Sequence, residues 1–297
     1  MHSKLFKLTQ RVIALTFCVG ALPFFFCPRV HAQEEVSSSQ LEPEKKDAAY
    51  YFAEYKEPVG FTYGASAKVQ TSYIWRGIYA GAANIQLDAN VGYGGLYANL
   101  WWNFGVTDWS FSRFQPEVDI TLGFARWGLD VYALFIHSFN CGFFDFGYNP
   151  GGGNALEVGV RYTVSSKLPL SILWATRFTN ADAYINTAGD TVRAYSTYIE
   201  LSYTHHFPYD ISLYGALGIT PWRSSYTHYE RGFAVQNIDI RLRKDWSVHE
   251  RCGLMIQGQL TINPSAIAAD RSSVRWKPLD PGSQSINANI AFGVYLK

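Results

Sequence analysis

The chain has 297 residues, with 25 basic and 24 acidic side chains and a formal net charge of +1. This balance leaves no basic excess for phosphate binding, so we expect no nucleic-acid partner. Beyond the N-terminal region no stretch holds about 18 consecutive apolar residues, which excludes a helical membrane span there.

The N-terminal region resembles a secretory signal. Basic residues precede an apolar stretch at 12–26, and small or apolar residues stand at the positions that a signal peptidase reads before Ala32. We expect a signal peptide over residues 1–32; the alternative, a retained membrane anchor, needs about 20 apolar residues. Residues 33–59 are polar and charged, and we expect them to form a short periplasmic N-terminal arm.

Residues 61–76 alternate strictly between two faces, with the single exception of Ile74. A strand repeats every two residues, so this pattern predicts one apolar and one hydrated face. The apolar face carries its aromatic residues at the two ends and small residues in the middle. This order is typical of a strand that crosses a lipid bilayer, where aromatic rings gather at the interfaces.

The same alternation returns along the rest of the chain. It is found at 84–93, 96–104, 117–127, 129–136, 155–164, 168–178, 193–204, 210–220, 233–243, 251–263 and 286–296. Bacterial barrels have an even number of strands, and this count gives about twelve. We predict an all-β fold, a transmembrane antiparallel up-and-down β-barrel over residues 60–297.

The connections between these segments alternate in length, which orients the barrel. Short turns at one end and long loops at the other predict that both termini lie in the periplasm. Aromatic residues then form two girdles on the lipid face: Trp75, Trp102, Phe104 and Phe178 at the outer ends, and Phe61, Tyr93, Phe124, Tyr162 and Tyr203 at the inner ends. The alternative, a secreted soluble β-protein, has no need of such girdles.

Charged residues fall on the polar face of the strands. A charge in the middle of the lipid layer costs about 2–4 kcal/mol for Arg or Lys, so we expect these residues to line a lumen. The predicted pore-lining set is Lys68, Arg76, Asp88, Glu117, Asp119, Asp130, Glu157, Arg161, Arg177, Glu200, Arg241 and Arg243. Such a set either creates a selectivity field along a narrow channel or consists of mutually paired charges in a closed interior.

The sequence offers no site for catalysis, a metal or a cofactor, and we expect none. His137 and Ser138 are adjacent, so on a strand their side chains point to opposite faces. The pair His205 and His206 matches no metal-binding spacing. The two cysteines outside the expected signal peptide, Cys141 and Cys252, are expected at opposite ends of the barrel, too far apart for a disulfide.

Two segments carry a resemblance to a known family. Residues 71–104, with an aromatic-Arg-Gly corner at Tyr73 to Gly77, and residues 115–135, with a tight Gly turn, are similar to the TorF-like porin family of bacterial outer-membrane β-barrel proteins. The resemblance covers residues 60–220; the insert at 140–153 and the long last loop depart from it. It implies a pore-like barrel and supplies no catalytic residues.

The expected function combines these patterns. We expect a narrow porin-like channel in the cell outer membrane, in contact with its lipid, for passive diffusion of small hydrophilic solutes. The alternative is a non-conducting barrel whose long outer loops bind a partner; the aromatic segment 141–146 either folds into the lumen as a constriction or contacts a partner or a sugar. Residues 286–297 resemble the final strand that the outer-membrane assembly machinery recognises, although Lys297 stands where an aromatic residue is usual.

Overall fold

The computed structural model describes the chain from Gly60 onward, with gaps. It covers residues 60–105, 116–137, 139, 141–147, 153–180, 182–230, 232–266 and 285–296. The signal peptide expected at 1–32, the arm expected at 33–59 and Lys297 lie outside these residues. Within them, no helix is long and apolar enough to span a membrane.

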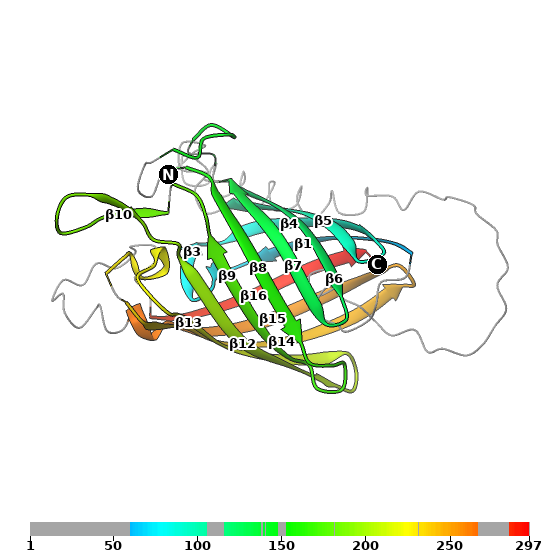
Figure 1. Cartoon of the computed structure of the whole chain (residues 1–297). Helices are drawn as coiled ribbons and strands as arrows, with labels where there is room; N and C mark the ends of the chain where they lie inside the picture. Colours follow the sequence, from blue (N-terminus) through cyan, green and yellow to red (C-terminus); the bar gives the residue numbers. More distant parts are fainter. Residues whose placement is uncertain are drawn as a thin grey trace, which may run out of the picture. The chain divides into compact units, whose positions relative to one another are not determined.

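Twelve strands of the described part close into one antiparallel barrel in which each strand pairs with its neighbours in the chain (Figure 1). They are β1 (Phe61–Gln70), β4 (Asn84–Tyr93), β5 (Leu96–Gly105), β6 (Glu117–Arg126), β7 (Leu129–His137), β8 (Ala155–Thr163), β9 (Leu170–Arg177), β12 (Thr197–Phe207), β13 (Ile211–Thr220), β14 (Ala234–His249), β15 (Cys252–Ile262) and β16 (Ile286–Leu296). The last strand, β16, pairs with both β15 and β1 and so closes the barrel. The predicted fold class and strand number are confirmed.

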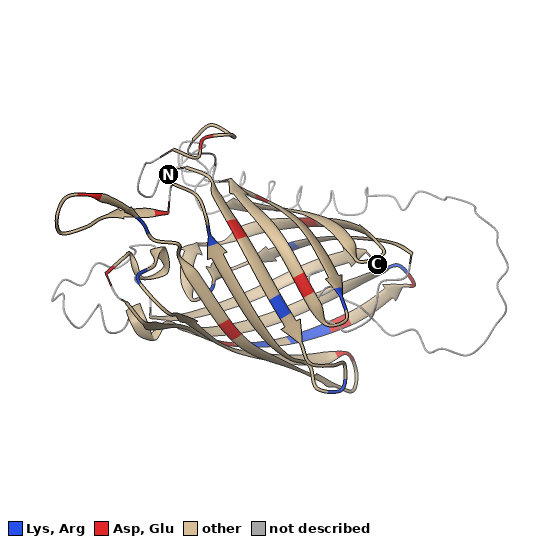
Figure 2. Ribbon diagram, viewed as in Figure 1, with Lys and Arg blue, Asp and Glu red and all other residues tan. Residues whose placement is uncertain are grey.

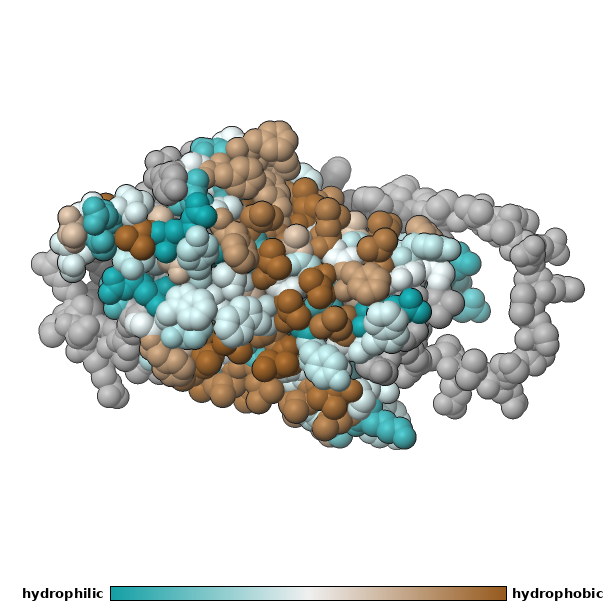
Figure 3. Space-filling view, viewed as in Figure 1, coloured by the Kyte–Doolittle hydropathy of each residue, from teal (hydrophilic) through white to brown (hydrophobic). Residues whose placement is uncertain are grey.

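Each wall strand has an apolar outer face and a polar inner face. On β8, Leu156, Val158 and Val160 are exposed, whereas Glu157 and Thr163 between and beyond them are buried. An isolated water-soluble domain would bury the first set and expose the second, so the pattern is that of a barrel turned toward lipid. Figure 3 shows hydrophobic side chains gathered over the wall strands.

One end of the barrel has tight turns. Tyr93 pairs with Leu96 around Gly94 and Gly95, which both have positive φ, as the two central residues of a tight hairpin require. β1 begins and β16 ends at this short-turn end, since Phe61 pairs with Tyr93 and Leu296 with Cys252. The longer connections lie at the opposite end, which we call the long-loop end.

Three strands differ from the sequence prediction by more than two residues. β12 covers Thr197–Phe207 instead of 193–204, and Thr191–Arg193 form a separate short strand. β14 continues from the predicted end at residue 243 to His249, because it stays paired with β15 as far as Cys252. The first strand ends at Gln70 instead of residue 76, and the next residues form a separate hairpin of β2 (Tyr73–Trp75) and β3 (Ile78–Gly81).

Tyrosine rings on the inner face lie over glycines of the adjacent strand. Tyr132 pairs with Gly159 across β7 and β8, and a Cβ atom at Gly159 would stand 2.1 Å from the Tyr132 ring. Tyr97 lies over Gly123 in the same way. Each glycine therefore provides the space in which a large ring lies flat against the wall.

Candidate functional site: a hairpin inside the barrel

The chain leaves the wall after Gln70 at two hydroxyl residues. Thr71 Oγ1 donates to Asn289 Oδ1 at 3.1 Å, and Ser72 Oγ donates to the Ala288 carbonyl at 3.1 Å. The Ser72 amide also donates to Asn289 Oδ1. These bonds tie the departing backbone to β16 in place of the ladder that ends there, so the next residues can turn into the barrel.

The β2–β3 hairpin turns at Arg76 and Gly77, which have φ angles of 49° and 82°. Gly77 approaches the barrel wall so closely that a Cβ atom there would lie 2.1 Å from the Gln236 carbonyl oxygen. Asn263 Nδ2 donates to the Gly77 carbonyl at 3.1 Å. The tip of the hairpin therefore rests against the long-loop ends of β14 and β15.

The hairpin is also tied to the other side of the wall. Tyr73 OH donates to Glu117 Oε1 on β6 at 2.7 Å. Arg76 reaches Glu157 on β8 with both terminal nitrogens: Nη1 lies 2.6 Å from Oε2 and Nη2 lies 2.7 Å from Oε1. This is the bidentate geometry in which a guanidinium and a carboxylate bind most strongly. The hairpin thus connects strands from opposite parts of the barrel and narrows its interior.

The ion pair is enclosed almost completely. The Glu157 side chain is fully buried, and the Arg76 side chain is 10% exposed. Tyr132 OH and Tyr226 OH each donate to Glu157 at 3.3 Å, and Arg76 donates to Tyr226 OH. A carboxylate with this many partners has its lone pairs satisfied, which a buried ion pair needs in order to offset its desolvation.

Aromatic rings complete the surroundings of the guanidinium groups. Arg76 lies 4.6 Å from the centre of the Trp75 ring and 4.7 Å from that of Tyr198. Arg177, next to Glu157 across β8 and β9, lies 5.1 Å from the Trp75 ring and 5.3 Å from Tyr226. Tyr226 belongs to the 3-10 turn η3 (Ser225–Thr227), which therefore enters the barrel from the β13–β14 connection.

This arrangement corrects the prediction for Tyr73 and Trp75. Simple alternation placed both rings on the lipid face and Trp75 in the outer girdle. Tyr73 is instead buried inside the barrel, and the Trp75 ring packs against that of Tyr226 with the ring centres 5.5 Å apart. The alternation fails because the wall strand ends at Gln70. Of the other predicted outer rings, Trp102 and Phe178 are exposed and Phe104 is half-buried beside Trp102.

Arg76 lies on the hairpin, and the other predicted pore-lining residues alternate along the wall with the outward-facing apolar positions, so they share the inner face. Figure 2 shows charged residues distributed along the wall strands. Arg76, Glu157 and Arg177 come together, and Glu117 joins them through Tyr73. Several others have hydrogen-bond partners elsewhere in the interior: Asn99 to Asp88 at 2.9 Å, Tyr97 to Asp130 at 2.7 Å, Tyr198 and Tyr214 to Glu200 at 2.6 and 2.7 Å, Arg241 to Asp239 at 2.6 Å and Arg243 to Asp245 at 2.8 Å. Lys68, Asp119 and Arg161 share the inward face of β1, β6 and β8 with these residues.

Some interior residues were missed from the sequence. Asp239, Arg241, Arg243 and Asp245 occupy every second position of β14. The same two-residue period that gave the arginines could therefore have given the two aspartates. Tyr226 gave no signal, because it enters from a loop. The sequence prediction also omitted a group of side-chain amides on the inner wall. Gln70 Nε2 donates to Asn84 Oδ1 at 3.1 Å, and Asn289 Nδ2 donates to Gln70 Oε1 at 3.3 Å.

The aromatic segment after β7 lies outside the barrel. Phe143 packs against Phe135 of the outer wall at 5.0 Å, so in its described part this segment does not form the lumen constriction that the sequence left open. Cys141 lies there at the long-loop end and Cys252 at the short-turn end, and both are free. In the described part of the chain no group of His, Cys, Asp or Glu side chains could hold a metal ion.

Solved structures of similar fold are outer-membrane barrels, although no known protein family and no curated protein matches the chain. The chain is similar to the NanC porin, with 14% identity, a TM-score of 0.46 and coverage of 80% of this chain and all of that one. It is also similar to the KdgM porin (7% identity, TM-score 0.41, 79% and 98% covered) and to an outer-membrane channel from Pseudomonas putida F1 (12% identity, TM-score 0.42, 85% and 99% covered).

Proposed function

We propose that the chain forms a narrow channel in a bacterial outer membrane, through which small hydrophilic solutes diffuse passively. The observation that carries the proposal is the polar interior, which runs along the wall strands inside an apolar exterior and is narrowed by an inward hairpin. An interior lined largely by polar side chains provides hydrogen-bonding partners for water and solutes along the way.

The β2–β3 hairpin is the constriction of the proposed channel. Its position is held by contacts to β6, β8, β14 and β15, so it acts as a fixed part of the pore and not as a mobile loop. In this region the positive charges of Arg76 and Arg177 act on Asp119, and that of Arg177 also acts on Glu117. Opposed charges across a constriction orient dipolar solutes, and neither sign is in large excess. We therefore expect small conductance and weak ion selectivity.

The proposal includes the remaining expectations from the sequence. Export by the signal peptide at 1–32 delivers the chain to the assembly machinery, and residues 60–297 form the barrel in the membrane. The resemblance of residues 71–104 supports a place in the TorF-like porin family. In that segment the aromatic-Arg-Gly corner is the tip of the constricting hairpin.

Recordings in planar bilayers test the proposal directly. Purified, folded protein should give small and reproducible conductance steps, and vesicles containing it should swell in solutions of small sugars but not of larger ones. Replacement of Arg76 by Ala removes the contact to Glu157 and should enlarge the conductance. Folded barrels that show neither channel events nor solute uptake would refute the proposal.

A further inference from the structure

A short aromatic segment, residues 141–147, is folded against the outer face of β7. We call it the phenylalanine foot. Phe143 and Phe146 pack on Phe135 with ring centres 5.0 and 5.9 Å apart, and Phe143 also contacts the His137 ring at 5.2 Å. Phe135 and His137 point outward from the wall, and the foot covers them, so His137 is buried although it is on the outside.

The foot is held in place by one fully buried residue, Asn154. Its Nδ2 donates to the carbonyls of Gly142 at 2.9 Å and Phe143 at 2.6 Å. Its Oδ1 lies 2.6 Å from His137 Nδ1 and accepts from Cys141 Sγ at 3.4 Å. The Asn154 amide also donates to the Asp145 carbonyl. These bonds fix the backbone of the foot, so the direction of its side chains is set by the fold.

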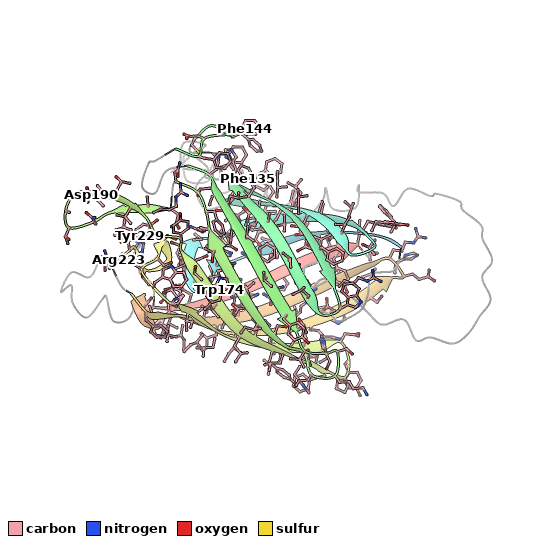
Figure 4. All side chains as sticks on the ribbon, in the orientation of Figure 1. Phe135, Phe144, Trp174, Asp190, Arg223 and Tyr229 are labelled. Atoms are coloured by element: carbon pink, nitrogen blue, oxygen red, sulfur yellow. The ribbon has the colours of Figure 1, made fainter. Side chains whose placement is uncertain are left out.

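The surface that the foot presents to its surroundings is almost purely apolar. Phe144 at its tip is 83% exposed, and Phe143 is about half exposed. Phe139, which precedes the foot and contacts the His137 ring, is also half exposed. Figure 4 shows Phe144 standing off from the wall above Phe135. Asp145 carries the only charge of the foot, and its Oδ1 accepts from the Gly147 amide at 2.9 Å within the foot itself. A tip built in this way places its most apolar ring where an ordinary surface loop carries polar groups.

We propose that the phenylalanine foot inserts into the lipid leaflet at the long-loop end and anchors that side of the barrel. The apolar belt of the wall continues into it, since Phe135 belongs to the lipid-facing row of β7 and pairs with Leu156 of β8. Phenylalanine rings without hydrogen-bonding groups suit acyl chains. This inference rests on the apolar outer face of the barrel and is independent of whether the lumen conducts.

Two other occupants fit the foot less well. A sugar needs hydrogen-bonding groups beside the stacked rings, and the amide of Asn154 and Oδ1 of Asp145 are already engaged inside the foot. A second copy of the chain needs a stable interface of about 1,200–2,000 Å² in total, which a seven-residue foot does not supply by itself.

Spin labelling of the full-length chain in phosphatidylcholine vesicles tests the proposal. All four cysteines, Cys18, Cys27, Cys141 and Cys252, are first replaced by Ala, and a nitroxide is then attached at Phe144→Cys. Leu122→Cys, on the outer wall, serves as the lipid control. Asp190→Cys, on the exposed hairpin of β10 (Ala183–Ile185) and β11 (Thr191–Arg193), serves as the water control. Dissolved oxygen should speed the spin relaxation of the label at 144, and a water-soluble nickel complex should not, as for the label at 122.

Two results would overturn the proposal. A label at 144 that is as accessible to the nickel complex as the label at 190 would place the foot in water. A label at 144 that is shielded from both oxygen and the nickel complex, and that becomes accessible when labelled protein is diluted with unlabelled protein, would place the foot in a contact between copies of the chain.

A second measurement does not depend on the cysteine replacements. In the wild-type background, Phe143→Ser with Phe144→Ser should lower the urea midpoint of unfolding in vesicles. Ile185→Ser on the exposed β10–β11 hairpin is the matched control and should leave the midpoint unchanged. An unchanged midpoint in the double variant would count against the anchor.

Discussion

Two aromatic segments at the long-loop end of the barrel lie on opposite sides of its wall. The β2–β3 hairpin folds into the barrel, and the phenylalanine foot folds against its outside. The inward segment combines its rings with the guanidinium of Arg76 and the hydroxyl of Tyr73, and both have a carboxylate partner on the inner wall. The outward segment carries phenylalanine rings, which have no hydrogen-bonding groups. The difference teaches that the polar groups beside an aromatic ring decide on which side of the wall the ring is placed.

The contrast also explains how each segment is fixed. Inside, side chains of the segment bind the wall: Arg76 binds Glu157, and Tyr73 binds Glu117. Outside, a residue beside the wall binds the backbone of the segment, since Asn154 holds the carbonyls of Gly142 and Phe143. The inner contact is therefore sensitive to changes in charge, and the outer contact is sensitive to changes in apolar area.

The largest effect should come from breaking the inner contact. Glu157→Leu leaves the Arg76 guanidinium buried without its carboxylate, and such changes cost about 3–5 kcal/mol. We expect a loss of this size in the free energy of unfolding, measured by urea titration in vesicles. The double variant with Arg76→Leu should recover much of the loss, because no unpaired charge remains. Equal stability of Glu157→Leu and wild type would show that the ion pair does not hold the hairpin.

A smaller effect is expected where a ring lies against the inner wall. Gly159→Ala places a Cβ atom 2.1 Å from the Tyr132 ring, and overpacking of this kind costs about 1–3 kcal/mol. Gly258→Ala is the matched control, since nothing lies within 4 Å of the position of its added Cβ atom. The same titration should separate the two variants. If both glycines tolerate alanine equally, the ring does not need the space at Gly159.

The interior charges should tune selectivity without loss of the fold. Arg161→Glu replaces an inward positive charge by a negative one, so the reversal potential in a salt gradient should shift toward cation preference. Arg177 is a poorer probe, because its guanidinium stacks on Trp75 and Tyr226 and its replacement also disturbs the hairpin. Arg126→Glu, on the exposed short-turn end, is the control and should shift the potential much less. A shift toward anions with Arg161→Glu would contradict an inward position on the ion path.

The smallest effect concerns the thiol in the outer segment. Partial burial and the neighbouring Asp145 carboxylate raise the pKa of Cys141 above its ordinary value. A raised pKa lowers the thiolate fraction at neutral pH, so labelling by a membrane-impermeant maleimide should be slow there and accelerate as pH rises. Asp145→Asn should lower the pKa and speed labelling at neutral pH.

The same reagent distinguishes the two ends of the barrel in intact cells. Cys141 contacts Asn154 at the start of the foot and not at its inserted tip, so it should react from outside, although slowly. Cys252 at the short-turn end should stay unlabelled until the outer membrane is opened. Labelling of Cys252 alone would mean that the barrel is inserted in the opposite direction.

The sequence by itself determined the wall of the barrel. Alternation with a period of two predicted the all-β fold, the twelve strands and the inward face of residues such as Glu157 and Arg161, because a strand places neighbouring side chains on opposite faces whatever surrounds it. The lengths of the connections predicted the two different ends. These are local properties, and a local pattern is sufficient to read them.

Only the tertiary structure decided the contents of the barrel. The alternation of Tyr73 and Trp75 continued that of the wall, and the single exception at Ile74 was not enough to mark the turn inward after Gln70. The turn depends on partners far away in the chain: Asn289 for the departing backbone, Glu157 for Arg76 and Tyr226 for Trp75. The foot on Phe135 likewise depends on Asn154, which reaches back to its backbone. Contacts between distant residues set both positions, and a pattern read along the chain contains no information about them.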